Sequence, residues 1–281
     1  YADSMVKINK KWDRLDVLQA MKLTSQSLTP GFYATALDGK YTVDQGFVSQ
    51  VENRQIYVKL FWRTLLISGS VMLLCLLLGY PVAYLLATLP MRSSNLLMIM
   101  VLLPFWTSLL VRTTAWIAIL QSQGVVNDLL VWIGITSDES RFSLIYNMTG
   151  TIVAMTHILL PFMILPLYSV MKTIPPTYMR AARSLGATPT LAFVKIYMPQ
   201  TIPGVGAGGL LVFILAIGYY ITPALVGGQD GQLISNMIAY HMQKSLNWSL
   251  AAALGGILLA GVLFLYWAYD RIIGIDNMKL G

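Results

Sequence analysis

The sequence predicts an all-α fold: a polytopic bundle of transmembrane helices. Of the 281 residues, 56% are hydrophobic and only 11% are charged, whereas soluble domains carry roughly a quarter charged residues. Five apolar segments are each long enough for the ~20 residues that a membrane-spanning helix needs. They lie near residues 60–89, 96–121, 144–171, 204–227 and 249–269. The formal net charge of +7 is therefore interpreted through the placement of loops about a membrane, and not as affinity for nucleic acid.

Residues 1–58 are polar and mixed in charge, and they contain no spanning stretch. We expect a small subdomain of helix and loop, in which residues 12–21 form a short amphipathic helix. Thr29-Pro30-Gly31 and Asp38-Gly39 are turn signals.

Prolines interrupt the apolar segments. Pro81 lies in the first segment, Pro104 in the second, and Pro161 and Pro166 in the third. We expect these prolines to kink their helices, with neighbouring helices satisfying the freed carbonyl groups. Pro223 is predicted to end the helix over 204–227.

Basic residues set the orientation. Seven cations fall in loops on one side and only two, Arg141 and Lys244, in the loops 122–143 and 228–248 on the other. The seven are Arg92, Lys172, Arg180, Arg183, Lys195, Arg271 and Lys279. The positive-inside rule therefore places loop 172–203 in the cytoplasm.

This orientation divides the chain into parts. Residues 1–58 lie outside the cell membrane, residues 59–274 form the transmembrane domain, and residues 275–281 form a cytoplasmic tail. Because a polar segment as large as 1–58 does not cross a membrane unaided, we expect a sixth spanning helix preceding Tyr1.

Residues 178–204 have an unusual layout. Arg180-Ala181-Ala182 is followed after three residues by Gly186, and after nine more by Ile196-Tyr197-Met198-Pro199. This pattern predicts a short helix, a turn broken by glycine, and a second short helix ended by prolines. The small residues would let another surface approach the backbone closely.

This spacing resembles the EAA loop of binding-protein-dependent ABC importer permeases, which reads Glu-Ala-Ala, three residues, Gly, nine residues, Ile, any residue, Leu-Pro. Arg180 stands in place of the Glu and Met198 in place of the Leu. The Met preserves volume, but the Arg reverses a charge. An ion pair that the family makes through this Glu therefore does not carry over.

The resemblance covers most of residues 57–280 and extends to the polyamine (spermidine/putrescine) branch of that family. Four stretches carry it: residues 78–84, 103–107 and 159–168 in apolar segments, and 124–130 in an outer loop. Iron, thiamine and opine importers share the scaffold. Residues 1–58 are outside the resemblance.

The resemblance implies a permease of the type I ABC importer fold in the bacterial inner (plasma) membrane, moving a small cationic amine by alternating access. The implied partners are a second permease subunit, two ATPase subunits that carry ATP and Mg, and an extracytoplasmic substrate-binding protein. The chain itself is then neither an enzyme nor a cofactor protein. γ-Aminobutyrate-like amino acids, opines and iron chelates remain alternative cargoes. The residues implied to couple the loop to an ATPase are Arg180, Ala181, Ala182, Arg183, Gly186, Ile196 and Pro199.

A substrate path is predicted near residues 218–223, because transporters place sites at broken helices near the midplane. Tyr219 and Tyr220 offer rings for cation–π contact with an ammonium group, or they anchor the chain at the membrane interface. Thr222 adds a hydroxyl.

The second apolar segment adds Arg112, an expensive charge inside a membrane segment. It snorkels, binds backbone carbonyls or faces the path, and a structural role is favoured over a ligand role. Trp106 and Trp116, in the same segment, line the path or pack.

Acidic residues are absent from the apolar segments. Asp128 and Asp230 lie in outer loops, where they are candidates to meet a cationic cargo or the delivery protein. The lack of an embedded acid argues against tight polyamine binding by this subunit and fits selectivity held in a separate binding protein. His157 has no second ligand at helical spacing, so we interpret it as a hydrogen-bonded core residue.

The rival interpretation is an ion-driven secondary carrier or a membrane enzyme. A carrier would be expected to show intramembrane acids, and an enzyme a reactive cluster. The sequence has no Gly-Lys-Ser/Thr phosphate-binding loop, no Ser/His/Asp set and no cluster with metal-ligand spacing.

Overall fold

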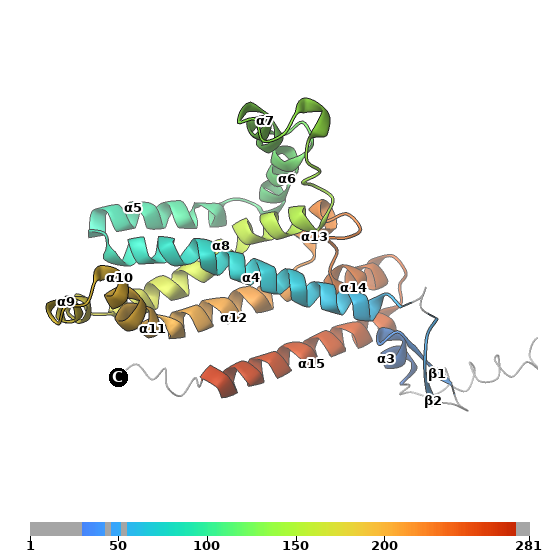
Figure 1. Cartoon of the computed structure of the whole chain (residues 1–281). Helices are drawn as coiled ribbons and strands as arrows, with labels where there is room; N and C mark the ends of the chain where they lie inside the picture. The colour runs from blue at the N-terminus through green and yellow to red at the C-terminus, as the bar shows by residue number, and fades with distance from the viewer. Residues whose placement is uncertain (1–29, 43–45, 52–54, 274–281) are drawn as a thin grey trace, which may run out of the picture. The chain divides into compact units, whose positions relative to one another are not determined.

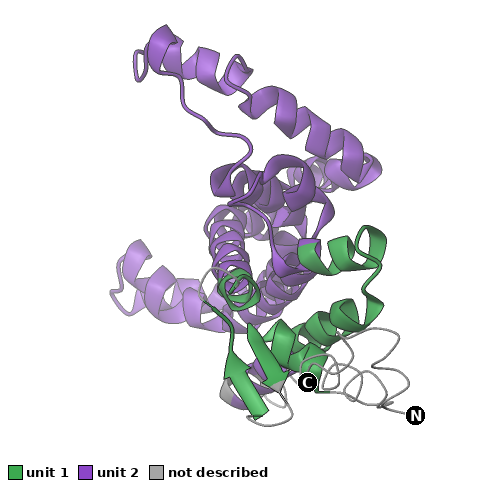
Figure 2. Ribbon diagram, turned by 90° about the vertical axis from the view of Figure 1, so that its right-hand side faces the viewer, with its two compact units in different colours: residues 1–62, 237–260 green, residues 63–236, 261–281 purple. Residues whose placement is uncertain are grey.

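The computed structural model describes residues 30–42, 46–51 and 55–273 (Figure 1). The chain divides into two compact units, residues 1–62 with 237–260 and residues 63–236 with 261–281 (Figure 2). Three helices pass along the chain from one unit into the other: α4 (Tyr57–Thr88), α14 (Ile234–Gln243) and α15 (Trp248–Ile273). The predicted amphipathic helix over 12–21 and the tail 275–281 lie outside the described residues.

The first unit contains a β-hairpin that the sequence analysis did not predict. After α3 (Gly31–Ala36), strand β1 (Gly39–Thr42) pairs antiparallel with β2 (Gly46–Ser49), with Lys40 opposite Val48. The expectation of helix and loop alone for this subdomain was therefore wrong. Strands of four residues are too short to show a clear alternation of apolar and polar residues.

Asp38 connects this hairpin to the start of α4. Its carboxylate accepts hydrogen bonds from the backbone N–H groups of Ile56 and Tyr57, both at 3.0 Å, and of Val58 at 2.8 Å. The first N–H groups of a helix have no partner within the helix. Asp38 therefore caps α4 from outside the helix, and the hairpin fixes where the helix begins.

Four helices in the described part of the chain are long and apolar enough to cross a membrane, and a fifth counts if one bent pair forms a single span. The four are Tyr57–Thr88, Leu109–Trp132, which a short turn at 121–124 divides into two helices, Met148–Thr173 (α8) and Trp248–Tyr269. The bent pair joins Pro189–Gln200 to Ile202–Gly218 (α12) at an angle of 59°. The helices α4 and α8 continue through their prolines.

Two of the predicted segments differ in detail. The segment expected to span continuously over 96–121 is divided into α5 (Met91–Leu102), the 3-10 helix η3 (Leu103–Trp106) and α6 (Leu109–Leu120). Pro104 lies in the first turn of η3 and the backbone becomes extended at Thr107, so the predicted kink is a full break. Helix α6 leads to α7 (Val125–Trp132) and then to the 3-10 helix η4 (Asp138–Ser140).

The other difference is at the end of α12. We expected Pro223 to end this helix, but α12 ends earlier, at Gly218. The backbone is extended at Tyr219, and Pro223 lies inside the next helix, α13 (Ile221–Val226). The prediction for Pro223 was wrong because proline is tolerated in the first turn of a helix.

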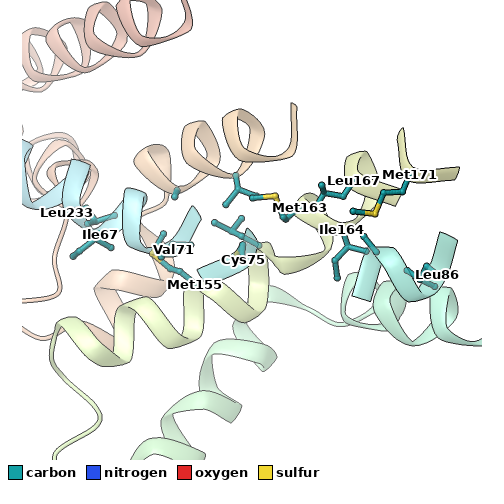
Figure 3. Packing of buried hydrophobic residues seen from close by; sticks show 14 of the residues in the cluster. Ile67, Val71, Cys75, Leu86, Met155, Met163, Ile164, Leu167, Met171 and Leu233 are labelled. Atoms are coloured by element: carbon teal, nitrogen blue, oxygen red, sulfur yellow. The ribbon is translucent and has the colours of Figure 1, made fainter. Parts of the chain in front are cut away.

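The core of the second unit forms between α4 and α8 (Figure 3). Val71 and Cys75 of α4 and Met155 and Met163 of α8 are fully buried, and the Cys75 thiol donates to the carbonyl oxygen of Thr156 at 3.4 Å. Cys75 is therefore a packing residue.

Helix α12 joins this core through glycines. A Cβ atom added at Gly208 would lie 2.9 Å from the sulfur of Met163, and one at Gly204 would lie 3.1 Å from Cβ of Val170. Small residues four apart let α12 and α8 approach closely, as in many membrane helix pairs.

Candidate functional site

The loop after α8 has the predicted shape. Helix α9 (Pro176–Ser184) is followed by a turn, and then α10 (Pro189–Ala192), the π-helical turn η5 (Phe193–Tyr197) and α11 (Met198–Gln200) form a second helical segment. That segment continues through Pro199 and ends one residue later, at Gln200, so the proline does not itself end it. No residue of α9 is buried, and Leu185 beside the turn is 90% exposed. The loop therefore presents both charged and apolar groups at its surface.

Gly186 is required by the backbone of this turn. Its φ is +89°, a region that residues other than glycine rarely enter. The N–H of Ala187 donates to the carbonyl of Ala182 at 3.1 Å, and the N–H of Gly186 donates to the carbonyl of Arg183 at 3.0 Å. These two bonds form a Schellman motif, which ends α9.

A small side chain at Gly186 is not needed for packing within the chain, because a Cβ added there would meet nothing within 4 Å. The close approach that we expected at Gly186 therefore remains a prediction about a contact with another protein. The loop residues Ala181, Ile196 and Pro199 are exposed and Ala182 is half-buried.

An aromatic cluster attaches the second helical segment to α4. The ring of Tyr84 meets Phe193 and Tyr197 edge to face, with centroids 5.4 and 5.3 Å apart, and Phe193 stacks on Tyr197 at 5.5 Å. Tyr80 contacts Phe193 at 6.3 Å, and its hydroxyl lies 3.1 Å from that of Thr201. This role was not predicted from the sequence, although the aromatic pairs 80/84 and 193/197 both have helical i, i+4 spacing.

Arg180 and Arg183 line a groove of about 470 Å³ beside this cluster. The other lining residues are Tyr84, Met179, Pro189, Thr190 and Phe193. The groove therefore combines two cations with apolar and aromatic walls.

A second group of predicted residues surrounds the break between α12 and α13. The carbonyl of Tyr219 accepts from the Ser235 hydroxyl at 2.6 Å, and that of Tyr220 accepts from the Asn236 amide at 2.8 Å. Backbone groups freed inside a membrane need such partners. The break is thus a stable feature of the fold.

Three helices contribute side chains here. Thr222 of α13 is fully buried, with its hydroxyl 3.3 Å from that of Thr113 in α6. The indole N–H of Trp116 in α6 donates to Nδ1 of His157 in α8 at 3.2 Å, which confirms His157 as a hydrogen-bonded residue.

Arg112 precedes Thr113 on α6. Its Nε is buried without an acceptor among the described residues. The structure thus brings Arg112, Trp116, Tyr219 and Thr222 into one neighbourhood.

The two remaining path candidates are more exposed. Trp106, at the end of η3, is 90% exposed, and Tyr220 is 40% exposed. Within the described ranges, Trp106 makes no hydrogen bond or ring contact with the group around Arg112.

Asp128 and Asp230, which were predicted to lie in outer loops, already have arginine partners within the chain. Asp128 lies 2.7 Å from Arg141, which also contacts Asp138 at 2.7 Å, and Asp230 lies 3.8 Å from Arg63. The hydrogen bonds that its guanidinium donates to Asp138 and Asp128 raise the pKa of Arg141. Less negative charge is therefore available to a cationic cargo than the sequence suggested.

Comparisons with known proteins agree with this architecture. Residues 57–273 match the family described as binding-protein-dependent transport system inner membrane component. The spermidine/putrescine transport system permease protein PotB of Escherichia coli (strain K12) is 34% identical over 241 residues, which cover 82% of this chain and 87% of that protein. The inner membrane ABC transporter permease protein YdcU of the same strain is 31% identical over 223 residues, or 75% of this chain and 70% of YdcU.

A solved structure shows the same fold. A chain in the crystal structure of a bacterial alginate ABC transporter, in complex with an alginate pentasaccharide-bound periplasmic protein, superposes with a TM-score of 0.67 and 16% identity. The match covers 99% of this chain and 94% of that one. The family match spans most of the sequence, and the described helices include four to five candidate spans. The chain is a multi-pass inner-membrane protein that belongs to the family of inner membrane components of binding-protein-dependent transport systems.

Proposed function

We propose that this protein is the permease subunit of an ATP-driven importer that carries a small cationic amine, spermidine or putrescine, into the cell. The observation that carries the proposal is the similarity to PotB, 34% identity over 82% of the chain. An alignment of this length includes both the coupling loop and the helices around Arg112.

The proposed assembly contains a second permease subunit, two ATPase subunits that bind ATP and Mg, and an extracytoplasmic substrate-binding protein. The family's description as binding-protein-dependent supports the last partner, as does the periplasmic protein in the alginate transporter complex. The chain has no phosphate-binding Gly-Lys-Ser/Thr loop, so hydrolysis is assigned to the ATPase subunits.

The mechanism follows from how the loop is attached. The Schellman turn at Gly186 gives α9 a fixed end. A force that the ATPase subunit exerts on α9 therefore moves the whole loop as one rigid unit. The aromatic cluster passes this displacement to α4, and the 59° bend before α12 passes it to the helix that ends at the break. Alternating access arises because packed helices change between discrete arrangements.

We propose that the path near the break passes a cation without binding it tightly. The described group around the break contains Arg112, Tyr219 and His157 but no carboxylate. Tyrosine rings attract ammonium groups weakly, by about 0.5–2 kcal/mol. We therefore assign selectivity to the binding protein, which delivers the amine to the outer mouth.

Uptake energetics test the proposal. Cells that lack the endogenous polyamine importers would receive this permease with its companion subunits, and uptake of radiolabelled spermidine and putrescine would be measured. We expect uptake that stops when ATP is depleted and persists when an uncoupler collapses the ion gradient. Uptake that fails first with the uncoupler would contradict the proposal, because it would indicate an ion-driven carrier.

A further inference from the structure

The groove between α9 and the second helical segment carries an unbalanced positive charge. Arg180 and Arg183 lie one turn apart on α9 and both line the groove, since residues three apart on a helix are neighbours. Both residues are exposed. None of the acidic residues in the described ranges forms an ion pair with either arginine.

The surrounding sequence offers no local partner. No Asp or Glu occurs between Glu139 and Asp230, so the whole cytoplasmic loop is basic. Two like charges placed one turn apart also repel each other and weaken an isolated helix slightly. An arrangement that is unfavourable within the chain becomes favourable when an outside anion joins it.

The groove walls explain why the anion would matter for coupling. Tyr84 and Phe193 belong both to the groove lining and to the aromatic cluster that attaches the loop to α4. A group seated between the arginines therefore lies next to the residues that transmit motion to the spanning helices.

We propose that this groove receives a carboxylate side chain of the ATPase subunit, which pairs with Arg180 and Arg183 during coupling. The inference rests on the proposed function and specifies the chemistry of its cytoplasmic partner. It also reverses the polarity expected from the Glu-Ala-Ala pattern, since the permease supplies the cations and the ATPase supplies the acid. Arginine suits such a contact because its planar donors can hold a carboxylate at two points.

A purely intramolecular role explains only part of the arrangement. Arg183 lies in the last turn of α9, where a cation interacts favourably with the helix dipole. Arg180 lies a full turn earlier, where this effect has faded, yet it lines the same groove. The dipole also does not require a groove with aromatic walls.

The test compares charge reversals on the same loop. Lys195 is a matched control, because it is an exposed cation of this loop that does not line the groove. Affinity-tagged permease carrying R180E, R183E or K195E would be purified from membranes with the co-expressed ATPase subunit, and retained ATPase would be quantified at low and high salt. Detergent-solubilised permease yield and monodispersity report folding in each variant.

We expect R180E and R183E each to reduce ATPase retention by about tenfold or more, because a like charge opposite a carboxylate is strongly unfavourable. K195E should retain ATPase near the wild-type level, and R180K should retain an intermediate amount, because lysine keeps the charge but not the two-point contact. A lysine introduced at the correct Asp or Glu of the ATPase should restore retention to R180E, and a scan of that subunit's surface acids would find it.

Two results would overturn the inference: R180E and R183E retaining ATPase at the wild-type level, or K195E losing as much as they do. In both cases the proposed function stands, because the wild-type complex still assembles. Wild-type permease that retains no ATPase at all would overturn the proposed function and the groove contact together.

Discussion

The ring of Tyr197 meets the ring of Tyr84 edge to face, with the two centroids 5.3 Å apart and the planes at 85°. Tyr197 belongs to the second helical segment of the loop after α8, and Tyr84 belongs to α4. This pair therefore joins the part of the chain proposed to contact the ATPase to a helix that crosses the membrane.

Replacing Tyr197 with alanine should break this connection. Tyr197 is 6% exposed, and removing a buried aromatic side chain typically costs about 3–5 kcal/mol of folding free energy. We expect Tyr197→Ala to abolish uptake while ATP hydrolysis continues, measured side by side in proteoliposomes.

Tyr197→Phe is the matched control. The Tyr197 hydroxyl is buried without a hydrogen-bond partner in the part of the chain that the structure describes, so its removal should leave coupling intact. Loss of coupling in the phenylalanine variant would show that the hydroxyl, and not the ring contact, carries the effect.

The effect of a substitution at Gly186 should depend on how readily the new residue adopts a positive φ, and not on the size of its side chain. A β-branched residue at φ +89° costs about 1–3 kcal/mol of strain, although the space beside Cβ is open. We expect Gly186→Val to lower uptake per ATP hydrolysed, and Gly186→Asn to lower it less because asparagine enters the left-handed region more readily. Equal effects of Val and Asn would indicate a steric contact with the partner.

The loop and the break show how far the sequence could lead. Motif spacing predicted the helix, turn and helix around Gly186, because glycine and proline act on the local backbone. It did not predict the partners of Tyr84 and Tyr197, which lie far apart in the chain and meet only after folding. The break after Gly218 was predicted too far along the chain, at Pro223. Its true position depends on the hydrogen bonds that Ser235 and Asn236 donate to the freed carbonyl groups.

Composition had similar limits. It separated membrane segments from polar ones, so most predicted spans correspond to observed helices. It could not show that Asp128 and Asp230 are already paired with arginines, because a long-range ion pair leaves no periodic signal. The pairing of β1 with β2 was missed because each strand has only four residues.

The hydrogen bond from Trp116 to His157, 3.2 Å long, should stabilise the region around the break. Trp116→Phe removes the donor and leaves the His157 acceptor unsatisfied, which costs about 1–3 kcal/mol. We expect a lower thermal unfolding midpoint in detergent and reduced uptake.

A double-mutant cycle gives the control for this pair. His157→Leu in the Trp116→Phe background should add little further destabilisation, because the two residues share one interaction. Fully additive losses would contradict the contact.

Acidic conditions should loosen α14. Burial lowers the pKa of the His241 imidazole, whose nitrogens lie 3.0 Å from the Tyr57 hydroxyl and 2.8 Å from that of Ser245. The folded form therefore binds a proton less readily than the unfolded form. Stability is present above the unfolded pKa of about 6.5 and is lost as the pH falls from there toward the lower folded value.

Hydrogen exchange of α14 at pH 7.5 and pH 5.5 checks this sign. We expect faster exchange at the lower pH after correction for intrinsic rates. His241→Gln cannot titrate and should show no such change; the same acceleration in that variant would assign the effect to another group.

ATP hydrolysis by the purified assembly, reconstituted with its binding protein, tests the central claim most directly. The assay would compare spermidine, putrescine, γ-aminobutyrate and an opine as ligands of the binding protein. The account predicts that spermidine or putrescine stimulates hydrolysis and that Gly186→Val permease loses the accompanying uptake. Stimulation by γ-aminobutyrate or the opine alone, with none by either polyamine, would contradict the assigned cargo, and hydrolysis indifferent to the binding protein would contradict the importer itself.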